Sequence, residues 1–131
     1  MNRQYFSPLL AVLLAAVVAA GCGKSSPKLH DVNGTVKFDG QDVAEGDITF
    51  IPEDKSVGAE GGKIKAGRYT LKVKEGKNKV QILANRLIPG KKGPMGEDAV
   101  EPYIPEKYND KTELTADVAA GKTTHNFDLK K

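Results

Sequence analysis

Few residues of this 131-residue chain belong to the types that carry out covalent or metal chemistry. It has one cysteine, Cys22, and two histidines, His30 and His125, and Ser56 is the only serine beyond residue 26. A serine hydrolase site would have to combine Ser56 with His125 and an aspartate, yet no nucleophile-elbow glycine pattern surrounds Ser56. We therefore expect His125 to be a structural residue at the edge of the fold, and a small hydrolase using it is the weaker alternative.

The spacing of acidic residues gives little support for a metal site. With no second cysteine and no histidine pair at ligand spacing, zinc is not expected. Asp39 and Asp42, or Glu53 and Asp54, could offer oxygen ligands to Ca²⁺. The run DGQD is primarily a turn sequence, however, and lacks the spacing of a calcium loop. The sequence predicts no cofactor and no enzymatic activity, and a calcium- or small-ligand-binding protein remains an alternative.

The N-terminal segment has the pattern of an export signal. Arg3 supplies a positive charge, and an uncharged run rich in Leu, Ala and Val follows from residue 5 to residue 21. Its strongly apolar part, residues 9–20, is shorter than the roughly 20 residues that a membrane-spanning helix needs. A cleaved signal at residues 1–21 is therefore expected rather than a permanent membrane span.

The small residues Ala19, Ala20 and Gly21 precede Cys22, and this run resembles the lipobox of bacterial lipoproteins, although Ala19 stands where Leu is most common. The resemblance implies that cleavage frees Cys22, whose thiol receives a diacylglycerol and whose amino group can be acylated. Each acyl CH₂ contributes about 0.8 kcal/mol, so several chains would anchor the protein stably. Because Gly23 rather than Asp follows, the resemblance also implies an outer-membrane location in the cell envelope. The alternative is an ordinary signal peptide that leaves a free thiol.

The rest of the chain divides into a short tether and one domain. Residues 22–28 contain the polar run GKSSPK, which suits a flexible spacer. Residues 29–131 are the length of one ordinary domain. The 20 basic and 17 acidic residues are spread along the chain, for a net charge of +3, so no nucleic-acid footprint is expected.

Period-two alternation of apolar and polar residues predicts an all-β domain of about seven short strands. Turn residues between the strands favour an antiparallel β-sandwich. We expect the strands near 69–73 and 80–84 to form a hairpin, and the only helical candidate is 105–110. The expected strands lie at about 32–38, 48–52, 64, 69–73, 80–84, 114–118 and 127–129.

Longer runs carry a second resemblance. Residues 32–53, VNGTVKFDGQDVAEGDITFIPE, and 67–82, GRYTLKVKEGKNKVQI, resemble the carboxypeptidase-regulatory-like, or transthyretin-like, β-sandwich. Residues 104–129 are similar to small lipoproteins of planctomycete bacteria that carry this domain. The resemblance implies transthyretin-like topology and an extracytoplasmic binding or structural module. An enzyme branch of these folds, which hydrolyses a purine-derived ring, ends in Tyr-Arg-Gly-Ser, whereas this chain ends in FDLKK.

The segment 86–111 is expected to be a long connection, rich in proline and glycine. One interpretation is a surface crossover between the two sheets, with its tyrosines packed against it. The other is a contact loop, in which basic residues meet an anionic partner and a tyrosine serves as the apolar anchor. The scarcity of aromatic residues favours an envelope protein over a saccharide as partner, beside the membrane reached through the lipid. The candidate contact residues are Arg86, Lys91, Lys92, Tyr103 and Tyr108.

Overall fold

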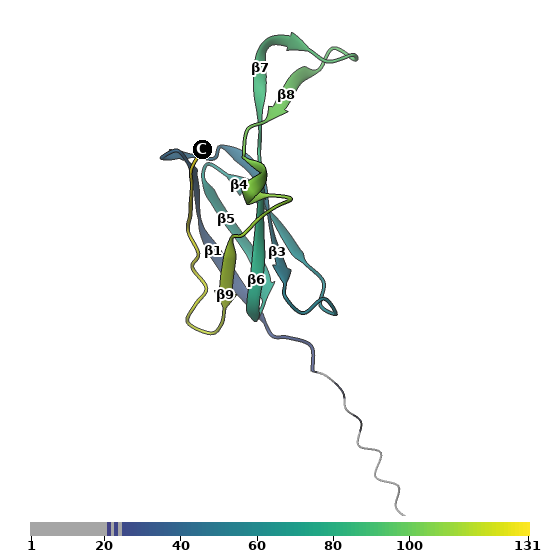
Figure 1. Ribbon diagram of the computed structural model, residues 1–131, viewed down its shortest axis with the longest axis vertical. Coiled ribbons are helices and arrows are strands. Elements are labelled where there is room, and N and C mark those ends of the chain that lie inside the picture. The colour runs from purple at the N-terminus through teal and green to yellow at the C-terminus, as the bar shows by residue number, and fades with distance from the viewer. Residues whose placement is uncertain (1–20, 22, 24) are drawn as a thin grey trace, which may run out of the picture.

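The computed structural model describes residues 21, 23 and 25–131 (Figure 1). The described part is all-β and largely antiparallel, which confirms the expectation of an all-β, antiparallel domain. Cys22 and the expected signal segment, apart from Gly21, lie outside the described residues. No helix within the described part is long and apolar enough to span a membrane.

Most strands join one curled sheet. Its order is β10-β1-β5-β4-β3-β6-β9, with β2 paired to β1, while β7 and β8 form a separate two-stranded hairpin. One 3-10 turn, η1 (Glu106–Tyr108), falls within the segment that the sequence marks as a helical candidate. The strands are β1 (Leu29–Phe38), β2 (Gln41–Asp42), β3 (Glu45–Pro52), β4 (Glu60–Lys65), β5 (Arg68–Lys74), β6 (Gly76–Leu83), β7 (Asn85–Lys92), β8 (Asp98–Pro102), β9 (Thr115–Val118) and β10 (Phe127–Leu129).

The sheet curls because its two halves are joined at one corner. β10, β1 and β5 make one half, and β4, β3, β6 and β9 make the other. β4 and β5 are in register only at Lys65 and Arg68, on either side of a tight turn at Ala66 and Gly67. Both turn residues have positive φ, 49° and 70°. The two halves therefore face each other across the core as a half-barrel.

The core is built from the alternating apolar residues that the sequence pattern identifies. Every second side chain of a strand points to the same face, so the inward residues of both halves meet. Phe50 is fully buried, and its ring centroid lies 6.0 Å from that of Tyr69 and 6.4 Å from that of Phe127. The fully buried aliphatic residues include Val32, Val36, Ile48, Val73, Val80, Ile82 and Val118.

The expected hairpin between residues 69–73 and 80–84 is wrong. β5 pairs with β1 and β4, whereas β6 pairs with β3 and β9, so the turn between them carries the chain from one half of the sheet to the other. Gly76 has φ 112°, and the buried Asn78 donates from Nδ2 to the carbonyl oxygens of Lys74 (3.2 Å) and Gly76 (2.9 Å). These two side-chain bonds hold the turn that crosses between the halves.

The C-terminal strand is parallel, not antiparallel, to its neighbour. β10 pairs with the end of β1, and the approach to it is held by the backbone of Asn33. The N–H of His125 donates to the Asn33 carbonyl oxygen (2.9 Å), and the Tyr69 hydroxyl donates to the His125 carbonyl oxygen (2.6 Å). A Cβ on Gly34 would lie 1.8 Å from that oxygen, so only glycine permits this approach.

The segment 86–111 is mostly regular, in contrast to the long connection expected from its sequence. β7 and β8 pair from Asn85 with Pro102 to Lys92 with Asp98, with an irregularity between Leu87 and Lys92. The hairpin projects from one end of the curled sheet (Figure 1). Pro89, Gly90 and Gly93 therefore belong to a bulged hairpin rather than to a crossover between sheets.

Candidate binding surface at the projecting hairpin

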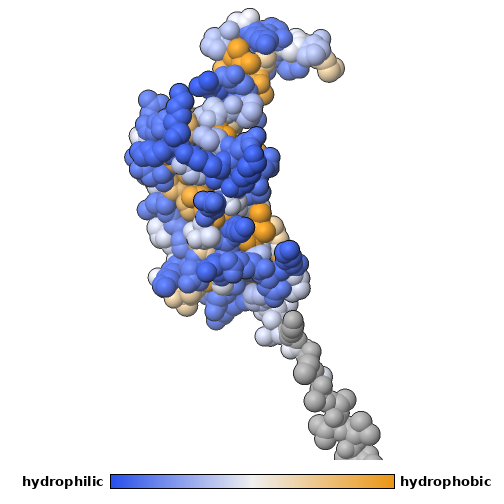
Figure 2. All heavy atoms as spheres, in the orientation of Figure 1, coloured by the Kyte–Doolittle hydropathy of each residue, from blue (hydrophilic) through white to orange (hydrophobic). Residues whose placement is uncertain are grey.

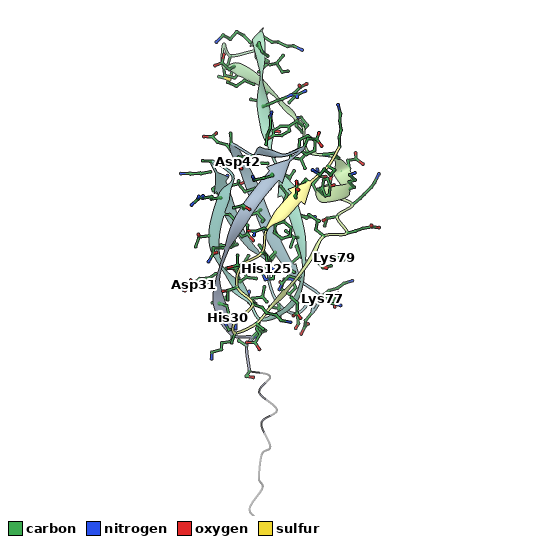
Figure 3. The ribbon with its side chains drawn as sticks, turned by 90° about the vertical axis from the view of Figure 1, so that its left-hand side faces the viewer. His30, Asp31, Asp42, Lys77, Lys79 and His125 are labelled. Atoms are coloured by element: carbon green, nitrogen blue, oxygen red, sulfur yellow. The ribbon has the colours of Figure 1, made fainter. Side chains whose placement is uncertain are left out.

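The hairpin lies at the end of the body opposite the start of the domain. Glu75, just before β6, donates its N–H to the Lys28 carbonyl oxygen (2.7 Å), which places the residues leading into β1 beside the start of β6. Eight residues of β6 span about 26 Å, and β7 begins two residues after β6 ends. His30, near the start of β1, and Asp42, at the hairpin end, mark the two ends of the body in Figure 3.

Two of the predicted cationic contact residues are paired within the hairpin. Arg86 Nε lies 2.7 Å from Glu101 Oε1, and Lys92 Nζ lies 2.5 Å from Asp98 Oδ1. Lys91 is exposed. Exposed ion pairs of this kind contribute about 0–1 kcal/mol each, so a charged group of a binding partner could replace either carboxylate at little cost. The hairpin is consequently less cationic than the predicted contact with an anionic partner assumes, because each of these two positive charges has a carboxylate beside it.

Arg86 and Tyr103 come together at the base of the hairpin. The Tyr103 ring packs edge-on against Phe38, with centroids 5.7 Å apart, and the Arg86 guanidinium carbon lies 6.0 Å from the Tyr103 ring centroid. Burial raises the pKa of Tyr103, and the positive charge of Arg86 partly opposes this shift. The rings border an open groove of about 1100 Å³. We call this hollow the aromatic groove; its lining includes Phe38, Gln41, Asp42, Asn85, Arg86 and Tyr103.

Tyr108, the other predicted contact tyrosine, has a different position. Its hydroxyl accepts a hydrogen bond from the N–H of Lys130 (2.9 Å), and Lys107 Nζ lies 5.1 Å from its ring centroid. The ring is half-buried and packs against the core. Tyr108 does not line the aromatic groove. Tyr108 therefore holds the C-terminal segment against the η1 region. Of the five predicted contact residues, only Arg86 and Tyr103 share a site.

A second surface on the hairpin is apolar and was missed by sequence reasoning. Leu87 and Val100 are directly opposite each other across β7 and β8, and they are 61% and 55% exposed. Leu83, at the end of β6, is 43% exposed, and all three border a hollow of about 520 Å³. We call these three residues the apolar hairpin face, and apolar residues on the projection are visible in Figure 2. The prolines and glycines within 85–102 obscured the two strands that carry this face.

The serine and histidine residues considered for a hydrolase site do not contact one another. Ser56 Oγ donates to Asp54 Oδ1 (2.6 Å) within its own turn, and His125 Nε2 lies 3.1 Å from the carbonyl oxygen of Lys122. His30 Nε2 lies 2.7 Å from Glu75 Oε2 near the start of β1. The side-chain contacts of Ser56, His30 and His125 are thus local or structural.

The candidate calcium ligands also have other partners. Asp39 Oδ1 accepts a hydrogen bond from the N–H of Lys131 (3.0 Å), and Asp42 Oδ1 lies 3.9 Å from Lys37 Nζ. Asp54 is engaged by the N–H of Ser56 (3.0 Å). Across residues 25–131, no group of three or more His, Cys, Asp or Glu side chains converges as metal ligands would.

Comparisons of the chain with family models, curated proteins and solved structures found no match. The pattern of the N-terminal sequence and the geometry of the hairpin are therefore what support the function proposed next.

Proposed function

We propose that this chain is a lipid-anchored protein of the cell envelope whose domain is a non-catalytic binding module. The lipobox-like run ending at Cys22 supports the anchor, with acyl chains on that residue and an outer-membrane location. The observation that carries the binding role is the hairpin β7–β8, which stands clear of the body at the end remote from the start of β1 (Figure 1).

We also propose that the domain is a transthyretin-like β-sandwich. The single registered pair between β4 and β5 separates the sheet into two facing halves, as a sandwich requires. The turn between β5 and β6 crosses from one half to the other, which is the kind of connection that joins two sheets. The parallel pairing of β10 with β1 would be a variation on that plan.

The aromatic groove is the proposed contact site for an envelope protein. Phe38 and Tyr103 offer apolar ring surface, while Arg86 and Asp42 offer charges of both signs. Aromatic residues and arginine are enriched among the residues that carry binding energy at protein interfaces. A peptide segment with an apolar side chain flanked by polar groups fits this lining.

The proposed anchor and the groove are compatible in distance. Seven residues from 22 to 28 reach at most about 24 Å from the lipid surface to the start of β1. The body then adds the length of β6, about 26 Å, before the hairpin begins. A lipid on Cys22 would therefore hold the start of β1 near the membrane and present the groove to the compartment beyond it.

Site-specific photo-cross-linking in a lipoprotein-processing host tests this function. A photoreactive residue replacing Gln41, on the rim of the groove, should give one discrete envelope-protein adduct. Tyr103→Ala should reduce that adduct about tenfold, which corresponds to the roughly 1.4 kcal/mol that an aromatic anchor readily supplies. The matched control places the same probe at Thr70, an exposed position of β5. Equal adducts at both positions, or an adduct indifferent to Tyr103→Ala, would refute the proposed site.

A further inference from the structure

We propose that the apolar hairpin face, Leu83, Leu87 and Val100, binds the same face of a second copy of this chain. The dimer would be two-fold symmetric, with the two bodies side by side and the hairpins in contact. This surface adjoins the aromatic groove, because Leu87 and Glu45 border both hollows. Leu83 and Val100 border only the hollow of the apolar hairpin face, so the two surfaces overlap at one margin.

Exposed apolar side chains are concentrated at this end of the molecule. Five large apolar residues in the described part are exposed, and four of them belong to β6, the hairpin and its tip: Leu83, Leu87, Val100 and Met95, the last 93% exposed. Only Leu29 lies elsewhere. Scattered apolar residues on a surface need no explanation, whereas a contiguous group marks a contact site.

Packing of another surface against the hairpin would stabilise it. β7 and β8 pair with each other and with no other described strand, and an isolated two-stranded hairpin is marginally stable in water. Its edges are poor sites for adding a strand, because Pro89 in β7 and Pro102 in β8 lack an N–H, and Lys91 and Lys92 place charge on the β7 edge. A partner therefore covers the face of the hairpin and does not extend its edge.

The charges bordering the face fit a second copy of the chain as the partner. Beside the hollow, β3 carries Glu45 and Asp47 next to Lys65 and Lys63 of β4, with Glu45 opposite Lys65 and Asp47 opposite Lys63. Asp47 and Lys63 are already in contact at 2.5 Å. A partner of one strong charge would repel one of these rows. A two-fold copy can instead set its acidic row against the basic row, twice over.

The position of the N-terminal end of the domain fits the same symmetry. A two-fold axis parallel to the long axis leaves the starts of both β1 strands at one end and both hairpins at the other (Figure 1). Two copies anchored in one membrane could meet this way without bending their tethers. Confinement to a surface would also raise their effective concentration. The contact itself does not depend on the lipid, so it can be tested whether or not Cys22 is acylated.

Cysteine cross-linking of the full chain in its membranes tests this proposal. Val100→Cys, treated with a short bismaleimide, should give a homodimer identified by mass. The unsubstituted chain and Thr70→Cys, on an exposed site of β5, should give at least tenfold less. A cross-link of Val100→Cys to another protein, or equal dimer from all three chains, would overturn the proposal. If the chain is recovered without lipid, the same comparison is made in solution.

Charge-exchanged variants test the predicted register. Lys65→Glu alone and Glu45→Lys alone should each weaken self-association at least tenfold in sedimentation velocity, because like charges then face each other. Mixing the two variants should restore association as a heterodimer, since each acidic row again meets a basic row. Circular dichroism and thermal melting confirm that both variants are folded. Folded variants that associate as the original chain does, or that fail to associate when mixed, would contradict the two-fold contact.

Discussion

Tyr69 shows how one side chain holds two distant parts of the chain together. It lies in the core on β5, and its hydroxyl donates to the carbonyl oxygen of His125 just before β10. His125 itself was predicted to be structural, and its backbone and ring both make backbone hydrogen bonds. The sequence indicated that Tyr69 is inward by its period-two position, but not the bond, because a parallel C-terminal segment 56 residues away has no local signal.

Tyr69→Phe should lower the free energy of unfolding by about 1 kcal/mol at neutral pH through loss of this hydrogen bond. Burial raises the pKa of Tyr69 above its usual 10.0, so the unfolded chain releases the proton first. The stabilisation by the neutral hydroxyl is therefore complete below about pH 10 and declines as the pH rises further. Urea unfolding from about pH 7 to 11 should show the gap between Tyr69→Phe and the original chain narrowing above about pH 10.

Tyr108→Phe is the matched control, because it also removes a hydroxyl bonded to the backbone but leaves Tyr69 in place. The Tyr108→Phe chain should keep the fall in stability above about pH 10, because Tyr69 is still present. If the free energies of unfolding of Tyr69→Phe and the original chain changed in parallel above about pH 10, ionisation of the buried hydroxyl would not be linked to folding.

At the scale of elements, the strands were more predictable than their partners. Alternation marked the segments of β1, β3, β5, β6, β9 and β10 because each has one buried face. It could not distinguish a hairpin from a crossing between halves at residues 75–77, because both turns use glycine and polar residues. Likewise, Arg86 and Tyr103 were predicted as contact residues. Their packing with Phe38 in one groove could not be predicted, because it depends on tertiary structure. The apolar hairpin face was hidden because prolines within 86–102 favoured a loop.

Asn78 decides the crossing between β5 and β6, and its replacement tests that role. It is 1% exposed, and its Nδ2 bonds two carbonyl oxygens. Asn78→Asp should cost about 3 kcal/mol of stability at neutral pH, because a buried carboxylate would face those oxygens without a donor. The loss should shrink as the pH falls toward about 4, where protonation restores one donor, and Asn78→Ala should show no such recovery. Urea unfolding at both pH values measures this, and a loss for Asn78→Asp that does not change with pH would contradict this role.

At the scale of the whole molecule, the start of β1 and the projecting hairpin occupy opposite ends of an elongated body (Figure 1). This arrangement matters for the proposed lipid anchor. A lipid on Cys22 would hold the start of β1 at a membrane and leave both surfaces of the hairpin accessible. The sequence could not reveal this arrangement, since it follows from the direction in which β6 crosses the body. The proposed anchor rests on the sequence alone, because Cys22 lies outside the described residues.

The most direct test of the central claim is the intact mass of the protein extracted from the membranes of a lipoprotein-processing host. We expect a mass that begins at Cys22 and includes acyl chains, while Cys22→Ser should lack them and leave the membrane fraction. The Cys22→Ser chain should keep its β-type circular dichroism, which controls for misfolding. A mass that begins at Cys22 or Gly23 without lipid, or unchanged membrane partitioning of Cys22→Ser, would contradict a lipid-anchored binding module.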